Sequence, residues 1–584
     1  MNKRFGFLRI LLVLITITIG TRLFFVQIIE HDEWAKKAEA QHSLENTLLA
    51  KRGNIYMMDG DEPVEAVMNE TVYTVIVDPM IVNKEEVKKT VTEYAGDFVT
   101  ANWDDVFVDK KLRYFVVARN VPRTNAKKIE EAGLVGVWMQ QGTKRVYPEG
   151  ELASGLLGFV NSDGEGQYGV EGAFNEQLAG KNGLLRAVKD INGIALSIGD
   201  ENVLIPAEDG ENVVLSIDKN VQFFVEKTLA EKLAAVNYDK ARASAIVIDP
   251  NSGKILAVAN LPNYDPANYG MVKDATDYVN YAFEEAYEPA SVCKTFTFAT
   301  AIDTGAMTPD TTYVNYGYTT VDDTIIRNAY EGMLGNITMR IALNYSLNSG
   351  STQALRLIGG DPNNINSAGM ETLYKYYHDN FGFGQVTGVE LSETNGYVPA
   401  PDSGYAMELT YANMTFGQGV SISLIQLASA FSSLINGGKY YTPTILAGKM
   451  NGDVFEKSES EVAPVRQTIS EEASATMRDM IYGTRTVRRL YGIDKPGYYI
   501  GGKTGTGQVV IQRPDGTWGY SEPTGETTAT YIGFGGAEGE LPEYVIAVRI
   551  WGEGYHFDGG DDALPMFDKI SSFMLDYLKI KPKE

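Results

Sequence analysis

Cysteine and histidine are scarce in this chain of 584 residues. The single cysteine, Cys293, excludes an intramolecular disulfide and a cysteine-rich metal site. The four histidines (His31, His42, His378 and His556) lie far apart and show no metal-ligand spacing. We therefore expect neither a metal nor another cofactor.

Basic residues are in deficit, because 51 lysines and arginines face 76 aspartates and glutamates, for a net charge of −25. An acidic chain repels phosphate, and its lysines and arginines form no stripe, so we exclude a nucleic-acid partner. Hydrophobic residues (44%) and charged residues (22%) occur at ordinary globular frequencies, which excludes a disordered chain. The length predicts several domains.

A long hydrophobic run occurs only once. Residues 10–29 carry one charge, Arg22, and are long enough to cross ~30 Å of hydrocarbon as a helix. Basic residues precede the run and acidic residues follow it, which predicts a cytoplasmic segment 1–9 and an outside location for everything after residue 30. The rival interpretation is a cleaved signal peptide. No A-x-A-like site follows the run, so we favour an uncleaved single-pass anchor in the cell membrane.

The remaining chain divides at a polar, turn-rich linker, 206–211. Before it, residues 30–210 mix short apolar strands with turns and predict an elongated, β-rich, non-catalytic module. Its first part, 31–50, is charged and helix-prone, as expected of a stalk. Residues 211–584 form the second predicted domain.

This second domain has the pattern of an α+β fold. Residues 243–249 and 254–260 predict a β-hairpin. Apolar spacing predicts helices over 220–236 and 291–304. Three further buried strands are predicted near the C-terminus, at 498–502, 528–534 and 544–550. An antiparallel sheet of sequence-distant strands with helices packed on it fits this order.

Three short motifs carry the candidate chemistry: Ser291-Val-Cys-Lys294, Ser346-Leu-Asn348 and Lys503-Thr-Gly-Thr506. Ser291 and Lys294 share one face of a helix that begins near Pro289. A serine hydroxyl is a weak nucleophile and needs an adjacent base, and no histidine has a suitable context. Lys294 suits that role if burial and the like charge of Lys503 lower its pKa.

The other motif residues suit a peptide substrate. Ser346 is expected to relay protons, and Asn348 to donate and accept at a substrate amide. Gly505 allows close approach of a substrate backbone, while the hydroxyls of Thr504 and Thr506 and the ammonium group of Lys503 suit a carboxylate.

Two further features have structural interpretations. Ser216-Ile-Asp-Lys219 repeats the S-x-x-K pattern, but Ser216 ends a predicted strand, so we interpret it as structural. Cys293 lies between Ser291 and Lys294 but points away from their helix face. We favour a small buried hydrophobic residue over a thiol nucleophile.

Additional motifs follow in order along almost the whole chain. They are Arg22-Leu23, Lys51-Arg52-Gly53-Asn-Ile55, Arg145-Val-Tyr-Pro148, Gly169-Val-Glu171, Leu215-Ser-Ile-Asp218, Pro262-Asn-Tyr-Asp-Pro266, Glu288-Pro-Ala-Ser291, Phe381-Gly-Phe-Gly384, Phe416-Gly-Gln-Gly419 and Asn436-Gly-Gly438. Together with the three-motif set, they resemble a class B penicillin-binding protein, a membrane-anchored peptidoglycan D,D-transpeptidase. The resemblance implies a penicillin-binding serine transpeptidase fold with an all-helical subdomain, preceded by a dimerisation-type pedestal.

The same resemblance assigns roles to residues. Ser291 would attack the D-Ala-D-Ala carbonyl, with Lys294 as the general base. Ser346 would pass the proton towards the leaving amine, and Asn348 would orient the peptide. Thr504 and Thr506 would hold the terminal carboxylate near Lys503. The backbone N–H groups of Ser291 and Thr506 would form the oxyanion hole. Implied partners are stem peptides, β-lactam inhibitors, a SEDS-type glycan polymerase and other divisome membrane proteins.

Three departures from the family pattern concern subfamily and partners. Tyr56–Gly60 replaces the usual Asp-Arg-x-Gly, Gly155 replaces a histidine, and Ser423-Leu424 stands where Thr-Pro is expected. The Phe416-Gly-Gln-Gly419 version and the lack of a longer tail favour the division-type branch over the elongation branch.

Three other functions stay open. A β-lactam-hydrolysing or β-lactam-sensing relative shares the three motifs, but no deacylating base or further membrane segment is evident. A non-enzymatic scaffold is disfavoured by retention of all three motifs. A bifunctional polymerase is disfavoured because residues 31–210 contain no Glu-Asp-x-x-Phe-type signature.

Overall fold

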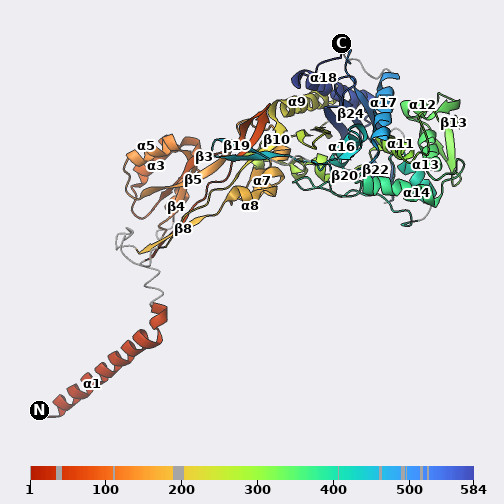
Figure 1. Cartoon of the computed structure of the whole chain (residues 1–584). Helices are drawn as coiled ribbons and strands as arrows, with labels where there is room; N and C mark the ends of the chain where they lie inside the picture. The colour runs from red at the N-terminus through yellow and green to blue at the C-terminus, as the bar shows by residue number, and fades with distance from the viewer. Residues whose placement is uncertain are drawn as a thin grey trace. The chain divides into compact units, whose positions relative to one another are not determined.

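The computed structural model describes residues 2–34, 43–108, 112–188, 203–237, 239–404, 407–458, 463–487, 494, 496–512, 517–521 and 525–583 (Figure 1). The chain forms two compact units. One contains Met1–Gly53 and Ala179–Glu211, and the other contains Asn54–Leu178 and Asn212–Glu584.

The first unit begins with the apolar helix α1 (Asn2–Phe24), which continues as the π-helix η1 (Phe25–Ile29). Among the described residues, Phe5–Ile29 is the one helix long and apolar enough to cross a membrane. The hydroxyls of Thr16, Thr18 and Thr21 each donate to the carbonyl four residues earlier, at 2.9, 2.8 and 2.8 Å. The hydroxyls of these threonines are thus satisfied without water, as favoured inside a membrane.

A three-stranded antiparallel sheet completes the first unit, with the order β1 (Ser43–Leu48), β8 (Gly183–Val188) and β9 (Val203–Ile205). The helical stalk predicted for 31–50 is wrong over 43–48, because pairing with β8 overrides the helix propensity of this stretch. Residues 31–34 are helical, and 35–42 lie outside the described residues.

The second unit contains a seven-stranded sheet that confirms the predicted β-rich region. Its order is β19 (Val454–Lys457), β18 (Leu446–Asn451), β10 (Asn212–Asp218), β2 (Ile55–Asp59), β3 (Glu62–Val77) and β4 (Phe115–Pro122), with β5 (Val137–Val146) also paired to β3. Helices α3 (Lys84–Ala95) and α5 (Arg123–Glu131) pack on the β3–β4–β5 part. The sequence analysis missed both helices, although Val87, Val91 and Ala95 recur at helical spacing in α3.

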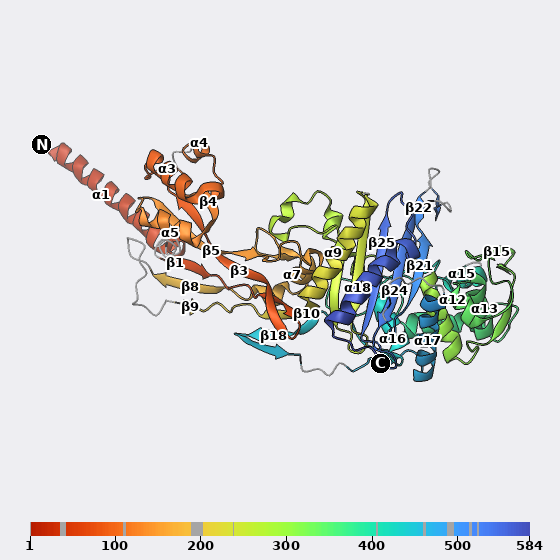
Figure 2. The ribbon, with the colours of Figure 1, turned by 90° about the horizontal axis from the view of Figure 1, so that it is seen from above.

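The five-stranded sheet of the second unit is the predicted antiparallel sheet. Its order is β12 (Ile255–Leu261), β11 (Ala241–Ile248), β25 (Tyr544–Gly552), β24 (Thr527–Gly535) and β21 (Gly501–Gln508). Helices α9 (Lys219–Val236) and α18 (Leu564–Tyr577) cover one face (Figure 2). Alternation decides the faces, because Ala245 and Val247 pack with α9 and α18, whereas Ile246 and Ile248 join the core on the other side.

The prediction for the edge strand is wrong in its bounds. β21 begins at Gly501, so the Lys503–Thr506 motif lies inside the strand and does not follow it. The run 498–500 only approaches the sheet through an isolated bridge of Tyr498 with Ala537. The predicted hairpin of β11 and β12 is confirmed.

The second face of the five-stranded sheet carries the helical subdomain. Its helices are α10 (Tyr281–Glu284), α11 (Cys293–Asp303), α12 (Met339–Asn344), α13 (Asn348–Ile358), α14 (Ser367–Tyr374), α15 (Met407–Met414), α16 (Leu424–Ile435) and α17 (Glu471–Val487), with 3-10 turns η3 (Pro266–Met271), η4 (Ala275–Tyr278) and η5 (Ala290–Val292) and the π-helix η6 (Lys375–Asn380). Two small sheets accompany them, β13 (Thr312–Asn315) with β16 (Gly335–Thr338) and β14 (Tyr318–Val321) with β15 (Thr324–Arg327).

The remaining elements are short. They are α4 (Trp103–Val106), α6 (Ser154–Leu157), α7 (Gly169–Ala173), α8 (Asn175–Ala179), β6 (Phe159–Val160), β7 (Gly166–Gln167), β17 (Lys439–Tyr440), β20 (Arg466–Gln467), β22 (Val510–Gln512), β23 (Trp518–Tyr520), the 3-10 turn η2 (Gly96–Phe98) and the π-helix η7 (Gly559–Ala563).

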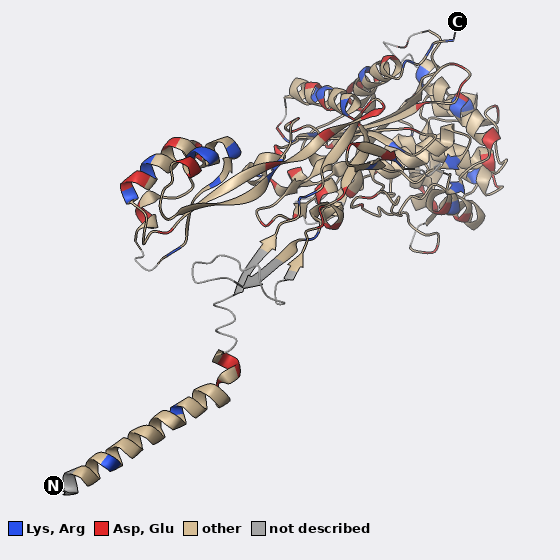
Figure 3. Cartoon of the chain, turned by 60° about the vertical axis from the view of Figure 1, so that its left-hand side comes forward, with Lys and Arg blue, Asp and Glu red and all other residues tan. Residues whose placement is uncertain are grey.

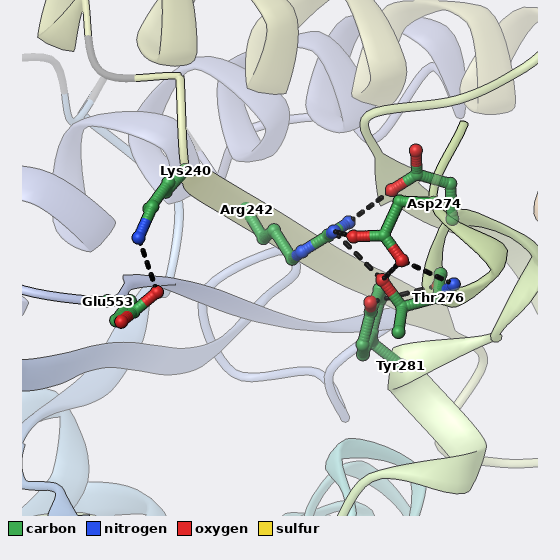
Figure 4. Close-up of polar contacts among 7 residues, drawn as sticks. Lys240, Arg242, Asp274, Thr276, Tyr281 and Glu553 are labelled. Carbon is green, nitrogen blue, oxygen red and sulfur yellow. Dashed lines mark hydrogen bonds and ion pairs between the residues drawn. The ribbon is translucent and has the colours of Figure 1, made fainter. Parts of the chain in front are cut away.

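Arg242 anchors the segment that leads from β12 towards Ser291. Its guanidinium donates to Asp277 at 2.7 Å and to the Thr276 hydroxyl at 3.1 Å (Figure 4). The Tyr281 hydroxyl donates to the Thr276 carbonyl at 2.9 Å, and the ring lies 5.2 Å from the Arg242 guanidinium. The half-buried arginine therefore fixes this connection to β11, next to the exposed Lys240–Glu553 pair.

Candidate active site

Ser291 lies in the 3-10 turn η5, which leads directly into α11. The preceding residue, Ala290, has a φ of 52°, which is unusual for a residue with a side chain. Gly417 makes this turn possible, because a Cβ at that position would lie 2.1 Å from the Ala290 carbonyl oxygen. Strained backbone of this kind persists where the surrounding structure holds it, as at functional sites.

The edge strand β21 packs against the same turn. A Cβ at Gly505 would lie 2.6 Å from the Pro289 carbonyl oxygen. Glycine is therefore required here for contact with the nucleophile turn. The sequence analysis attributed the same requirement to a substrate backbone. The contact places Ser291 beside a strand that carries Lys503.

Lys294 joins the predicted serine to the second motif. Its Nζ donates to Ser291 Oγ at 2.9 Å, to the Ser346 carbonyl at 2.6 Å and to Ser346 Oγ at 3.1 Å. The side chain is 1% exposed. The predicted helical spacing of Ser291 and Lys294 therefore produces a direct contact between hydroxyl and amine.

Lys503 reaches the same hydroxyl from the sheet. Its Nζ donates to Ser346 Oγ at 3.0 Å and to the Thr504 carbonyl at 2.8 Å, and the residue is 3% exposed. Ser346 has a φ of 55° between α12 and α13, which turns its hydroxyl and carbonyl towards the lysines. The structure thus brings Ser291, Lys294, Ser346 and Lys503 into one continuous hydrogen-bonded chain.

Asn348 flanks this chain without a contact to it in the part of the protein that the structure describes. It begins α13, and its side-chain amide donates to the Arg327 carbonyl at 2.9 Å. The role of its side chain at a substrate amide stays a prediction.

Thr504 and Thr506 lie on alternate positions of β21 from Lys503 and Gly505. Thr506 is exposed, donates to Asp558 Oδ2 at 2.9 Å and accepts from the Gly559 N–H at 2.9 Å. Asp558 also caps η7. The sequence analysis missed Asp558, although Asp-Gly-Gly is a recognisable cap signal.

Glu288 is a second missed residue beside the site. Its Oε1 accepts from the Gly419 N–H at 2.8 Å and from the Tyr520 hydroxyl at 3.0 Å. Burial raises the pKa of Glu288, and its Oε2 is buried without a hydrogen-bond partner among the described residues. The carboxyl group links β23 and the 417–419 turn to the segment before Ser291, and it belongs to the Glu288-Pro-Ala-Ser291 motif already noted.

Cys293 is fully buried, and burial raises the pKa of its thiol, which confirms the interpretation as a core residue. The described residues contain no cluster of three or more histidine, cysteine, aspartate or glutamate side chains suited to a metal.

A serine hydroxyl, an adjacent amine, a second hydroxyl and a second amine are the groups that acyl transfer through a covalent serine intermediate requires. The fold and the geometry of the site therefore fit the class of serine acyltransferases.

Comparison with known proteins identifies the family. Residues 243–572 match the family model "Penicillin binding protein transpeptidase domain", and residues 47–215 match "Penicillin-binding Protein dimerisation domain". The chain therefore belongs to the penicillin-binding protein transpeptidase family and is a serine D,D-transpeptidase. This confirms the class B, division-type resemblance.

Similar proteins span nearly the whole chain. Stage V sporulation protein D of Bacillus subtilis is 30% identical, over 100% of this chain and 87% of that protein. Peptidoglycan D,D-transpeptidase FtsI of Buchnera aphidicola is 29% identical, over 100% of this chain and 96% of that protein. A peptidoglycan synthetase from Bifidobacterium adolescentis has a similar fold, with a TM-score of 0.70, 22% identity and coverage of 93% and 98%. The structure of penicillin binding protein 3 from Mycobacterium tuberculosis in complex with aztreonam has a TM-score of 0.66 and 22% sequence identity. It covers 92% of this chain and 98% of that chain.

Proposed function

We propose that Ser291 is the nucleophile that cross-links peptidoglycan stem peptides. Lys294 removes the Ser291 proton as Oγ attacks the carbonyl of the penultimate D-Ala. The C–N bond to the terminal D-Ala breaks, and Ser346 passes a proton to the leaving amine. An amine of a neighbouring stem peptide then attacks the ester, which forms the cross-link and releases Ser291.

The second half of the site holds the donor peptide. Asn348 orients the peptide, and Thr504 and Thr506 bind the terminal carboxylate near Lys503. The backbone N–H groups of Ser291 and Thr506 stabilise the tetrahedral oxyanion. Asp558 and Gly559 already hold the Thr506 hydroxyl, so this side chain is oriented before substrate binds.

The setting follows from the sequence pattern. Residues 1–9 lie in the cytoplasm, 10–29 span the cell membrane, 30–210 form the pedestal and 211–584 form the transpeptidase domain outside the cell. A SEDS-type polymerase and other division membrane proteins are the proposed partners, since the chain itself contains no polymerase signature.

One observation carries the proposal: Lys294 Nζ lies 2.9 Å from Ser291 Oγ, and both lysines donate to Ser346 Oγ. A β-lactam hydrolase is a second function with the same parts. It requires a further base that activates water for rapid deacylation, and the three motifs do not supply such a residue.

Turnover of a penicillin adduct separates these functions. The full-length protein in detergent is labelled with fluorescent penicillin, freed of excess reagent and followed over time. A transpeptidase keeps the label, because the acyl-enzyme deacylates slowly to water. A D-Ala-D-Ala donor and a D-amino acid acceptor should also yield exchanged peptide with wild type but not with Ser291→Ala. Rapid loss of label without peptide exchange would identify a hydrolase.

A further inference from the structure

The strand β5 has an unpaired edge. In the described part of the chain, β5 pairs with β3 alone, over all ten residues from Val137 to Val146. Alternate N–H and C=O groups of such a strand point away from the sheet and can pair with another strand. Natural edge strands are protected by proline, lysine or shortness. β5 contains no proline, and its single lysine, Lys144, lies near its end, so that 137–143 carries neither residue.

A cleft of about 510 Å³ runs beside this edge, between α5 and β5. Its floor is formed by apolar and aromatic residues, among them Tyr73, Ala126, Leu134, Val137 and Met139. A helix alongside an open strand edge is a geometry that accepts an extended peptide, because backbone bonds form on the strand and alternate side chains enter the cleft.

Trp138, which also lines the cleft, offers a second contact. It is 42% exposed, and its ring centroid lies 6.3 Å from that of the half-exposed Tyr114. Successive side chains of a strand point to opposite faces. A strand added to β5 would therefore place one set of its side chains beside Val137 and Met139 and the other set beside Trp138.

The rim of the cleft carries two basic residues in the first half of α5 and one acidic residue, Glu130, near its end. Arg123 and Lys127 lie one turn apart and both line the cleft. Arg123 makes no ion pair with a described residue, and the pair of Lys127 with Glu131 is 3.7 Å long and exposed, hence weak. The N-terminal end of the nine-residue helix adds partial positive charge. Charged residues of both signs lie on the helices of this region (Figure 3). Among the residues that line the cleft, Arg123 and Lys127 outnumber Glu130, in contrast to the acidic chain as a whole.

We propose that the α5–β5 cleft binds an extended, acidic segment of another protein by strand addition to β5. Apolar side chains of the segment enter the cleft and contact Trp138, while a carboxylate faces Arg123 and Lys127. The site is separate from the Ser291 cluster in sequence and in its contacts, so this surface serves assembly and leaves the chemistry unchanged.

A designed peptide tests the proposal with the full-length protein in detergent. The probe is a short, fluorescently labelled peptide of alternating glutamate and valine, and its binding is followed by anisotropy. A lysine–valine copy and a copy with N-methyl groups on alternate backbone nitrogens serve as comparison probes. We expect saturable binding of the acidic probe, no binding of the methylated copy, and slower amide hydrogen exchange at 137–143 in the complex.

Charge variants define where the peptide lies. Arg123→Glu combined with Lys127→Glu should weaken the acidic probe roughly tenfold, because two attractive contacts become repulsive. Lys128→Glu is the matched control on the same helix, since this residue faces Tyr94 instead of the cleft. It should leave binding unchanged, and penicillin labelling should be equal in all variants.

Three results would overturn the proposal. The acidic probe does not bind, or it binds equally with N-methyl groups, so that strand pairing plays no part. Alternatively, hydrogen exchange at 137–143 is already slow in the free protein and depends on its concentration, which would make this edge an interface between two copies of the chain.

Discussion

Two serines in this chain are followed by lysine at the third position, and their surroundings differ completely. Ser291 lies in a turn that continues into α11, so Lys294 is one helical turn away and its amine reaches the hydroxyl. Ser216 lies inside β10, and α9 begins only at Lys219. The same sequence pattern therefore brings hydroxyl and amine together at Ser291 but not at Ser216, where the helix begins only at the lysine.

The Ser216 region instead connects several segments of the fold. Ser216 Oγ donates to the carbonyls of Ile255 at 2.7 Å and Thr444 at 3.1 Å. Asp218 caps α9 through the N–H groups of Asn220 and Val221, and Lys219 pairs with Glu149 on the surface. The polar side chains of the Ser216 motif therefore serve packing, helix capping and a surface ion pair.

The largest expected difference lies between the two lysines. Lys294→Ala removes the proposed base and should reduce the rate of penicillin acylation by about 10³- to 10⁴-fold. Lys219→Ala removes an exposed ion pair and should leave that rate within about twofold. Labelling with fluorescent penicillin, quenched at a series of times, measures the acylation rates of both variants. Equal acylation rates in the two variants would contradict the assignment of Lys294 as the base.

The second effect concerns the hydroxyl shared by both lysines. Ser346→Ala should slow acylation about 10²-fold, because the relay between Lys294 and Lys503 is lost. Ser351→Ala is the matched control, since among the described residues the Ser351 hydroxyl bonds only to the Asn348 carbonyl of its own helix, at 3.0 Å. The same labelling assay applies, and a control as slow as Ser346→Ala would indicate general disruption of α13.

The third effect is a pH dependence of folding stability, caused by a buried carboxyl group on α9 beside the Ser216 region. Burial raises the pKa of Glu226, on α9, from 4.5 to about 7, despite hydrogen bonds from Gln222 and the Ala153 N–H. Between these values the unfolded carboxyl loses its proton while the folded one keeps it. This group therefore contributes stability below pH 4.5 that is lost as the pH rises to about 7, on the order of 3 kcal/mol.

Thermal unfolding midpoints of wild type and Glu226→Gln, measured from pH 5 to 7.5, check this effect. Wild type should lose more stability than the variant over that range. Glu231→Gln, an exposed position on the same helix, should follow wild type. Parallel curves for wild type and Glu226→Gln would contradict the assigned ionisation.

The smallest effect is that of the structural serine itself. Ser216→Ala should cost about 1–2 kcal/mol of unfolding free energy, because the hydrogen bonding of its hydroxyl to the Ile255 and Thr444 carbonyls is lost. Acylation should stay unchanged. Chemical denaturation and penicillin labelling of the same preparation report the two quantities, and a loss of acylation without a loss of stability would assign Ser216 to the site.

Local pattern predicted those parts of the molecule whose contacts are local. The apolar run, the β11–β12 hairpin and the helical phase of Ser291 and Lys294 depend on residues a few positions apart. The predicted stalk failed over 43–48 because its partner strand lies about 140 positions later, and pairing with a distant strand is not visible in propensity.

The same reasoning explains what the site analysis missed. Spacing alone did not reveal that Ser346 adopts a φ of 55°, which turns its hydroxyl towards both lysines. Asp558 reaches Thr506 from a helix more than fifty positions away, and Gly505 is needed for contact with the Pro289 carbonyl. These are tertiary contacts between residues that are distant in sequence, so the motifs alone did not predict them.

Mass spectrometry of the protein after exposure to penicillin tests the central claim most directly, because it reports which residue carries the acyl group. The account predicts a single adduct in the peptide that contains Ser291, and an unmodified peptide containing Ser216. An adduct on Ser216 or Cys293, or no adduct on Ser291 in folded protein, would contradict it.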